Sequence, residues 1–119
     1  MINAITVDLE DWYHVCGDHA CADRSRWDAY ENRVLRNTAK VLELLARYNT
    51  RATFFVLGYI AEKNPALISA IQAAGHEIAT HGYWHRRVFE LTAAEFEEDV
   101  QQSIEVISAI TAEPVIGFR

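Results

Sequence analysis

The stretch ATFFVL at residues 52–57, closed by Gly58, is a continuous apolar run near the middle of the sequence. A short apolar run of this kind is typical of a strand that is buried on both faces of a parallel sheet. Before it, apolar residues between Arg33 and Tyr48 recur every three or four positions, which predicts an amphipathic helix packed on that sheet. Earlier still, residues 2–9 are β-rich and end abruptly in acidic side chains. The predicted order of these elements is β-α-β.

The rest of the sequence continues the same alternation. Two further predicted helices cover residues 64–75 and 92–110, and two further predicted strands cover residues 76–80 and 114–118. The first of these helices begins with an Asn-Pro pair and the second with a TAAE capping box, both of which are typical helix starts. Four strands that alternate with three helices predict an α/β fold, with a parallel sheet and the helices outside it.

Length and charge restrict the class of protein further. With 119 residues, half of them hydrophobic, the sequence predicts one globular domain at most. A net charge of −6 without a block of Lys and Arg argues against a nucleic-acid surface. The N-terminus lacks the pattern of a signal peptide, and no stretch approaches the roughly 20 apolar residues of a membrane span. We therefore expect no nucleic-acid partner, no membrane span and a cytoplasmic location.

The only two cysteines, Cys16 and Cys21, alternate with His14 and His19. These four residues could form a zinc site, but they all lie within a short segment, whereas structural zinc sites usually join two ligand pairs across a longer insertion. Two cysteines in a chain expected to be cytosolic do not imply a disulfide. We interpret this segment as a loop with reduced thiols that rims the site, and the compact zinc site is the alternative.

Side chains that commonly bind metals follow two of the predicted strands. The acidic segment DLED occupies residues 8–11, after the first strand, and HGYWH occupies residues 81–85, after the third. Sheets of this kind build their sites at the C-terminal ends of the strands, so we expect the two segments to meet. Two histidines and one carboxylate leave an open position on an ion, which is the pattern of catalytic zinc. The sequence therefore predicts a catalytic metal site.

Within the acidic segment, Asp8 and Glu10 point to the same side of an extended chain. Two carboxylates so close repel each other unless one is protonated or a cation lies between them. Arg119 leaves the last predicted strand beside Asp8, where its guanidinium could keep the carboxylate ionised through two parallel hydrogen bonds. Four aromatic residues near these groups suit either a sugar ring or simple packing: Trp12, Tyr13, Tyr83 and Trp84.

Five segments together resemble the polysaccharide deacetylases of the NodB homology type, which form carbohydrate esterase family four. They are TVDLEDW at 6–12, ATFF at 52–55, GHEI at 75–78, THGYWH at 80–85 and GFR at 117–119. Within the family, the Asp-x-Glu-Asp first motif is most similar to the subgroup found with exopolysaccharide and exosortase loci. The resemblance implies a distorted (β/α) barrel and hydrolysis of the acetamide of N-acetylhexosamine units in a polysaccharide.

The resemblance also implies roles for single residues. Asp8 matches the catalytic base and Arg119 the arginine that orients it, while His81 and His85 match the two metal-binding histidines. The implied cofactor is a divalent metal, with zinc as the expected ion.

The carboxylate ligand is less directly implied. The commoner family motif has two adjacent aspartates, whereas Leu9 follows Asp8 here. We therefore expect Glu10 to supply the metal carboxylate, with Asp11 as the alternative.

The family domain continues past the arginine with further strands, an acetyl pocket and a late histidine that acts as general acid. We therefore expect residues 1–119 to be the N-terminal part of a catalytic domain, a partial (β/α) barrel with parallel strands and outer helices, whose missing C-terminal half leaves this part inactive on its own. The expected partner is an acetylated polysaccharide or oligosaccharide. The alternatives are a related metal-dependent amidohydrolase that acts on a small amide, and a non-catalytic fragment that binds metal or carbohydrate.

Overall fold

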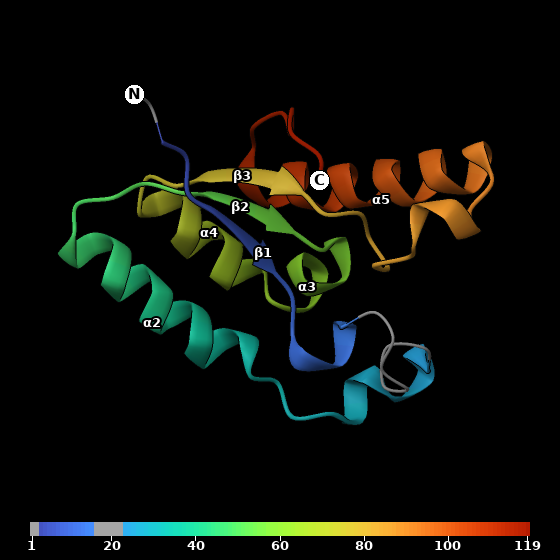
Figure 1. Cartoon of the computed structure of the whole chain (residues 1–119), viewed down its shortest axis with the longest axis horizontal. Coiled ribbons are helices and arrows are strands. Elements are labelled where there is room, and N and C mark those ends of the chain that lie inside the picture. The colour runs from blue at the N-terminus through green and yellow to red at the C-terminus, as the bar shows by residue number, and fades with distance from the viewer. Residues whose placement is uncertain (1–2, 16–22) are drawn as a thin grey trace.

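The computed structural model describes residues 3–15 and 23–119. Its centre is a parallel sheet of three strands in the order β1 (Thr6–Leu9), β2 (Thr53–Val56) and β3 (Glu77–Thr80). Figure 1 shows the three strands side by side and pointing in one direction, so their C-terminal ends share one edge of the sheet. The predicted α/β class is confirmed.

Four α-helices of the described residues pack against the sheet, and Figure 1 shows α2 beside β1 and α5 beside β3. The helices are α2 (Val34–Arg47), α3 (Gly58–Lys63), α4 (Pro65–Ala73) and α5 (Ala93–Thr111), with 3₁₀ helices η1 (Trp12–His14), η2 (Arg24–Ala29) and η3 (Val88–Glu90). Each of the three predicted helices is present. Within the described ranges, no helix combines the length and the apolar character that crossing a membrane requires.

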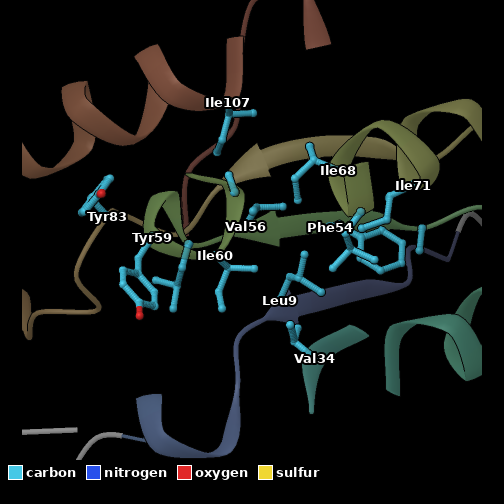
Figure 2. Close-up of a cluster of buried hydrophobic side chains, with 14 of the residues drawn as sticks. Leu9, Val34, Phe54, Val56, Tyr59, Ile60, Ile68, Ile71, Tyr83 and Ile107 are labelled. Atoms are coloured by element: carbon cyan, nitrogen blue, oxygen red, sulfur yellow. The ribbon is translucent and has the colours of Figure 1, made fainter. Parts of the chain in front are cut away.

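The core lies between the sheet and its helices. Figure 2 shows Phe54 and Val56 of β2 among side chains from β1, α2, α4 and α5, and both are fully buried. Burying such a side chain contributes about 1.5–3 kcal/mol to stability. Thr53 and Phe55, which point to the other face of β2, are only half-buried. The expectation that both faces of this strand are buried is therefore wrong, because the helices cover one face only.

The fourth predicted strand, residues 114–118, is reduced to one parallel bridge between Thr80 and Phe118. Two backbone hydrogen bonds form it, from Thr80 N to Gly117 O at 2.9 Å and from Arg119 N to Thr80 O at 3.2 Å. Pro114 has no N–H to donate to a ladder, which limits the pairing at the start of this segment. The bridge is nevertheless enough to bring the last residue to the C-terminal end of β3.

Helix α3 was not predicted, since no side chain caps its start at Leu57. Its first N–H groups instead bond to carbonyls of the HGYWH segment, from Gly58 N to Gly82 O at 2.9 Å and from Tyr59 N to Tyr83 O at 3.3 Å. A Cβ at Gly58 would lie 2.4 Å from the Tyr83 ring, so only glycine allows this approach. The short helix thus supports the segment that carries both histidines.

Candidate active site

Three predicted metal-binding residues lie together at the C-terminal edge of the sheet. Glu10 directly follows β1, His81 directly follows β3, and His85 lies four residues further on. One ligand atom from each lies within 4.8 Å of the other two, and all three residues are half-buried. The Glu10 carboxylate approaches the His85 ring to 3.3 Å. The arrangement joins two strands that are not sheet neighbours.

Both imidazole rings are oriented by backbone carbonyls. His81 Nδ1 lies 2.6 Å from Arg119 O, and His85 Nδ1 lies 2.5 Å from His14 O. Because a main-chain oxygen of this kind can only accept, we assign the hydrogen of each ring to Nδ1, which leaves the lone pair on Nε2. Metal-binding histidines are commonly oriented by such a contact at the second ring nitrogen.

The carboxylate of this cluster also fits a cation. Glu10 Oε2 is buried and accepts no hydrogen bond from the described residues, since His85 Nδ1, 3.3 Å away, directs its hydrogen to His14 O. Leaving a buried carboxylate oxygen without a donor is costly, and a divalent ion would remove that cost. Two imidazoles and a carboxylate are ligands that zinc accepts. The residues present therefore fit a divalent metal ion.

Asp8 and Arg119 form a pair beside this cluster. Arg119 Nη1 lies 3.4 Å from Asp8 Oδ1, and it donates a hydrogen bond to Thr6 Oγ1 at 2.8 Å. The expected pair of parallel hydrogen bonds is therefore absent, because Thr6, two residues earlier on the same side of β1, takes the nearer donor. Asp8 Oδ1 is buried and has no hydrogen-bond donor within the described ranges. A carboxylate oxygen without a donor has its lone pairs free to accept a hydrogen bond.

Asp11, the alternative metal ligand, has a different position. Its Oδ1 accepts from Trp12 N at 2.8 Å, and its Oδ2 accepts from Arg33 N at 2.7 Å and Val34 N at 2.9 Å. The carboxylate therefore caps η1 and the start of α2 at once, and it is 4% exposed. Asp11 lies outside the three-residue cluster, which favours Glu10 as the ligand.

The turn between the histidines is held by side chains that the sequence did not indicate. Tyr83 N donates to Asp99 Oδ2 at 2.7 Å and Trp84 N to Asp99 Oδ1 at 3.2 Å, while Gly82 N donates to Thr80 Oγ1 at 3.1 Å. The sequence offered only a partial signal for Asp99, which lies eight residues before the apolar Ile107 on one stripe of the predicted helix but has no partner there that the sequence reveals.

His14 also contributes without having been assigned a role at the site. Its carbonyl orients His85, and its ring Nδ1 accepts from Asp11 N at 2.8 Å. Burial, followed by the nearby His85, lowers the pKa of His14 to about 3. The alternative zinc site falls outside the described residues at Cys16, His19 and Cys21.

Of the four aromatic residues near the site, Tyr13 and Tyr83 are buried, and Trp12 is 37% exposed. Burial, with Asp11 and Asp28 nearby, raises the pKa of Tyr13 to about 12. Both buried tyrosines serve packing, whereas Trp12 and the half-buried Trp84 keep surface that a ligand could contact.

A cavity of about 320 Å³ opens beside the histidines. Its lining includes His81, His85, Phe89, Phe96, Phe118 and Arg119. The candidate site therefore combines polar groups with an apolar wall, which is the usual composition of a small-molecule site.

Fold and site together define an α/β protein with a candidate metal centre at the ends of parallel strands. A family model described as polysaccharide deacetylase matches residues 27–119. The chain belongs to this family, as its sequence motifs predicted.

Two relatives and three solved structures give the extent of the similarity. A peptidoglycan-N-acetylglucosamine deacetylase from Bacillus cereus is 33% identical over 76 residues, which are 64% of this chain and 28% of that protein. A chitooligosaccharide deacetylase from Sinorhizobium fredii is 46% identical over 48 residues, 40% of this chain and 22% of that protein. The chain thus spans well under half the length of these relatives.

Among solved structures, one from Mycobacterium smegmatis, described as a polysaccharide deacetylase, superposes with a TM-score of 0.78 at 27% identity over 98% of this chain and 41% of that chain. Peptidoglycan deacetylase PdaC from Bacillus subtilis gives 0.74 at 22% identity, covering 98% of this chain and 46% of that one. A family-four pseudoenzyme from Bacillus anthracis gives 0.74 at 21% identity, covering 97% and 33%. The last two similarities concern the fold alone.

Proposed function

We propose that the protein carrying this chain is a metal-dependent hydrolase that removes N-acetyl groups from N-acetylhexosamine units of a polysaccharide. The observation that carries the proposal is the cluster of Glu10, His81 and His85 beside the Asp8–Arg119 pair, in a member of the polysaccharide deacetylase family. Relatives named as peptidoglycan and chitooligosaccharide deacetylases support the class of substrate. The motif around Glu10 further suggests an exopolysaccharide as the natural polymer.

In this proposal Glu10, His81 and His85 hold a divalent ion, and zinc suits their mixed nitrogen and oxygen ligands. When bound, such an ion supplies a Lewis acid that polarises a carbonyl and lowers the pKa of a water molecule. The carbonyls of His14 and Arg119 keep the two rings turned toward the same point.

Asp8 then acts as the general base. Its carboxylate accepts a proton from the water whose oxygen attacks the acetamide carbon, and Arg119 holds that carboxylate in place. The C–N bond breaks next, releasing acetate, and the nitrogen leaves as a free amine after it takes up a proton. The family resemblance assigns that last proton to a histidine in a later segment of the domain.

The experiment compares acetate release from chitin oligosaccharides by the full-length natural protein and by its Asp8→Asn variant. Loss of the base should lower kcat by about 10²- to 10⁴-fold. The zinc content should stay unchanged, since Asp8 lies outside the ligand cluster.

Three outcomes would contradict the proposal. One is an Asp8→Asn variant that releases acetate at the normal rate. Another is a wild-type protein that hydrolyses only small cyclic or linear amides, which would favour the amidohydrolase alternative. The third is sugar binding without acetate release, which would identify a non-catalytic carbohydrate-binding protein.

A further inference from the structure

We propose that Asp99 of α5 is a positioning residue that sets the geometry of the two candidate metal-binding histidines. The inference rests on the proposed function, because it concerns the same metal centre. Asp99 itself is not a member of the ligand cluster, so its effect on an ion would act through the turn that joins His81 to His85.

The first argument is the complete use of the turn's backbone donors. Three consecutive N–H groups, at residues 82–84, each bond to a side-chain oxygen, and Asp99 accepts two of them. The third goes to Thr80, whose hydroxyl in turn donates to Ser103 at 2.6 Å. Because Asp99 and Ser103 are one helical turn apart, α5 holds the whole turn from one side.

The second argument is steric. Gly82 has φ of +74°, and a Cβ built on it would lie 2.8 Å from Asp99 Oδ2. A side chain at this position would therefore have to displace the carboxylate as well as adopt an unfavourable backbone conformation. The glycine of the HGYWH segment and the aspartate of α5 fit each other.

The third argument is strain at the ligand itself. His85 has φ of 54°, a left-handed conformation that is unfavourable for a residue with a Cβ. The two N–H groups that Asp99 binds directly precede His85 in sequence. Without the carboxylate, the turn can relax and let His85 return to a normal φ, which would move its ring away from Glu10.

The fourth argument is the burial of the Asp99 side chain, whose oxygens take backbone donors of the turn. It is 7% exposed, and no lysine or arginine of the described ranges forms an ion pair with it. Burying a carboxylate is costly unless hydrogen bonds compensate, and here two backbone donors of the histidine turn do so. The main hydrogen-bond partners of the Asp99 carboxylate are therefore the backbone N–H groups of the turn between His81 and His85.

The test is a zinc titration of the full-length natural protein by calorimetry, comparing wild type with Asp99→Asn. An asparagine keeps the size but turns an NH₂ group toward one of the two N–H groups. Losing a contact that orients ligands typically weakens metal affinity by about 10- to 100-fold, and we expect a loss of this size.

Two variants serve as matched controls on the same helix. Glu98→Gln removes an exposed carboxylate next to Asp99 and should leave zinc affinity unchanged. Thr92→Ala breaks the capping box of α5 and should lower the melting temperature by about 4 °C without touching the turn. If Asp99 only stabilised the fold, Thr92→Ala would lower zinc affinity as much as Asp99→Asn does.

Should the asparagine variant be partly unfolded at the assay temperature, its zinc affinity is read from the zinc-dependent rise in its melting temperature. Equal zinc affinity in wild type and Asp99→Asn would overturn the inference and leave the proposed function intact. Absence of zinc binding in the wild type would overturn the metal centre itself, so the two failures are distinguishable.

Discussion

At the scale of single residues, neighbouring acids have separate tasks. Glu10 has a buried oxygen without a donor and faces two imidazoles, whereas both oxygens of Asp11 accept backbone hydrogen bonds. Successive side chains leave an extended strand on opposite sides, which is why Leu9 packs in the core while Asp8 and Glu10 do not.

This division predicts opposite outcomes for two substitutions. Asp11→Ala removes the acceptor of three backbone donors and should lower the free energy of unfolding by about 2 kcal/mol, with zinc affinity of the folded chain retained. Glu10→Gln should weaken zinc binding and leave the stability of the metal-free chain nearly unchanged. Urea unfolding and zinc titration measure both effects. Loss of zinc on Asp11→Ala alone would make Asp11 the ligand.

Sequence reasoning identified the groups whose chemistry shows in the residue type itself. The spacing of His81 and His85 after one strand, and an acidic segment after another, sufficed to predict that they meet. It missed the carbonyl of His14 and the carboxylate of Asp99, because their roles depend on contacts between segments far apart in the chain. The position of Arg119 was predicted, but the bidentate contact was not found, since Thr6 competes for its donor.

At the scale of elements, helices with their own capping signals were predictable and those capped by other segments were not. The capping box at Thr92 predicted the start of α5. Helix α3 has no such local signal, because its first N–H groups donate to carbonyls of the HGYWH turn. The 3₁₀ helix η1 has a local capping box, but an unusual one that sequence patterns do not reveal. The His14 ring takes the place of the usual Glu or Gln.

The buried ring of His14 predicts a pH effect on stability. Its pKa is about 3 in the folded chain against an ordinary value of 6.5. As the pH falls below 6.5, the unfolded chain takes up a proton that the folded chain does not. The free energy of unfolding should therefore fall between pH 6.5 and about 3, by at most about 1.4 kcal/mol per pH unit from this group.

The check uses His14→Gln, which keeps an acceptor for Asp11 N but does not titrate in this range. Urea unfolding of both metal-free proteins at several pH values should give a shallower dependence for the variant below pH 6.5. Parallel curves for the two proteins would show that His14 does not remain neutral in the fold.

At the scale of the whole molecule, the α/β class followed from the alternation of apolar patterns, which depends only on which faces of each element are buried. The sequence did not predict which faces of the sheet the helices cover, because that depends on how many layers of helices pack against the sheet. Here helices cover the face of Phe54 and Val56, while Asp8, Phe55 and Arg119 share the other face. The site thus lies at the C-terminal edge of a sheet that helices cover on one face. The chain matches 28% of the length of a Bacillus cereus relative.

The central claim is that the C-terminal edge of this sheet binds one divalent ion through Glu10, His81 and His85. The most direct test is a calorimetric zinc titration of the chain and of its His81→Ala and His85→Ala variants, with His76→Asn as a histidine control away from the cluster.

We expect about one equivalent of zinc for wild type and the control, as three ligands around one ion imply. Affinity should fall by more than about 100-fold in the other two variants, beyond the loss that a missing supporting contact causes. Unchanged binding in His81→Ala and His85→Ala, with loss instead on Cys16→Ala and Cys21→Ala, would contradict the claim and assign the metal to the N-terminal Cys and His segment.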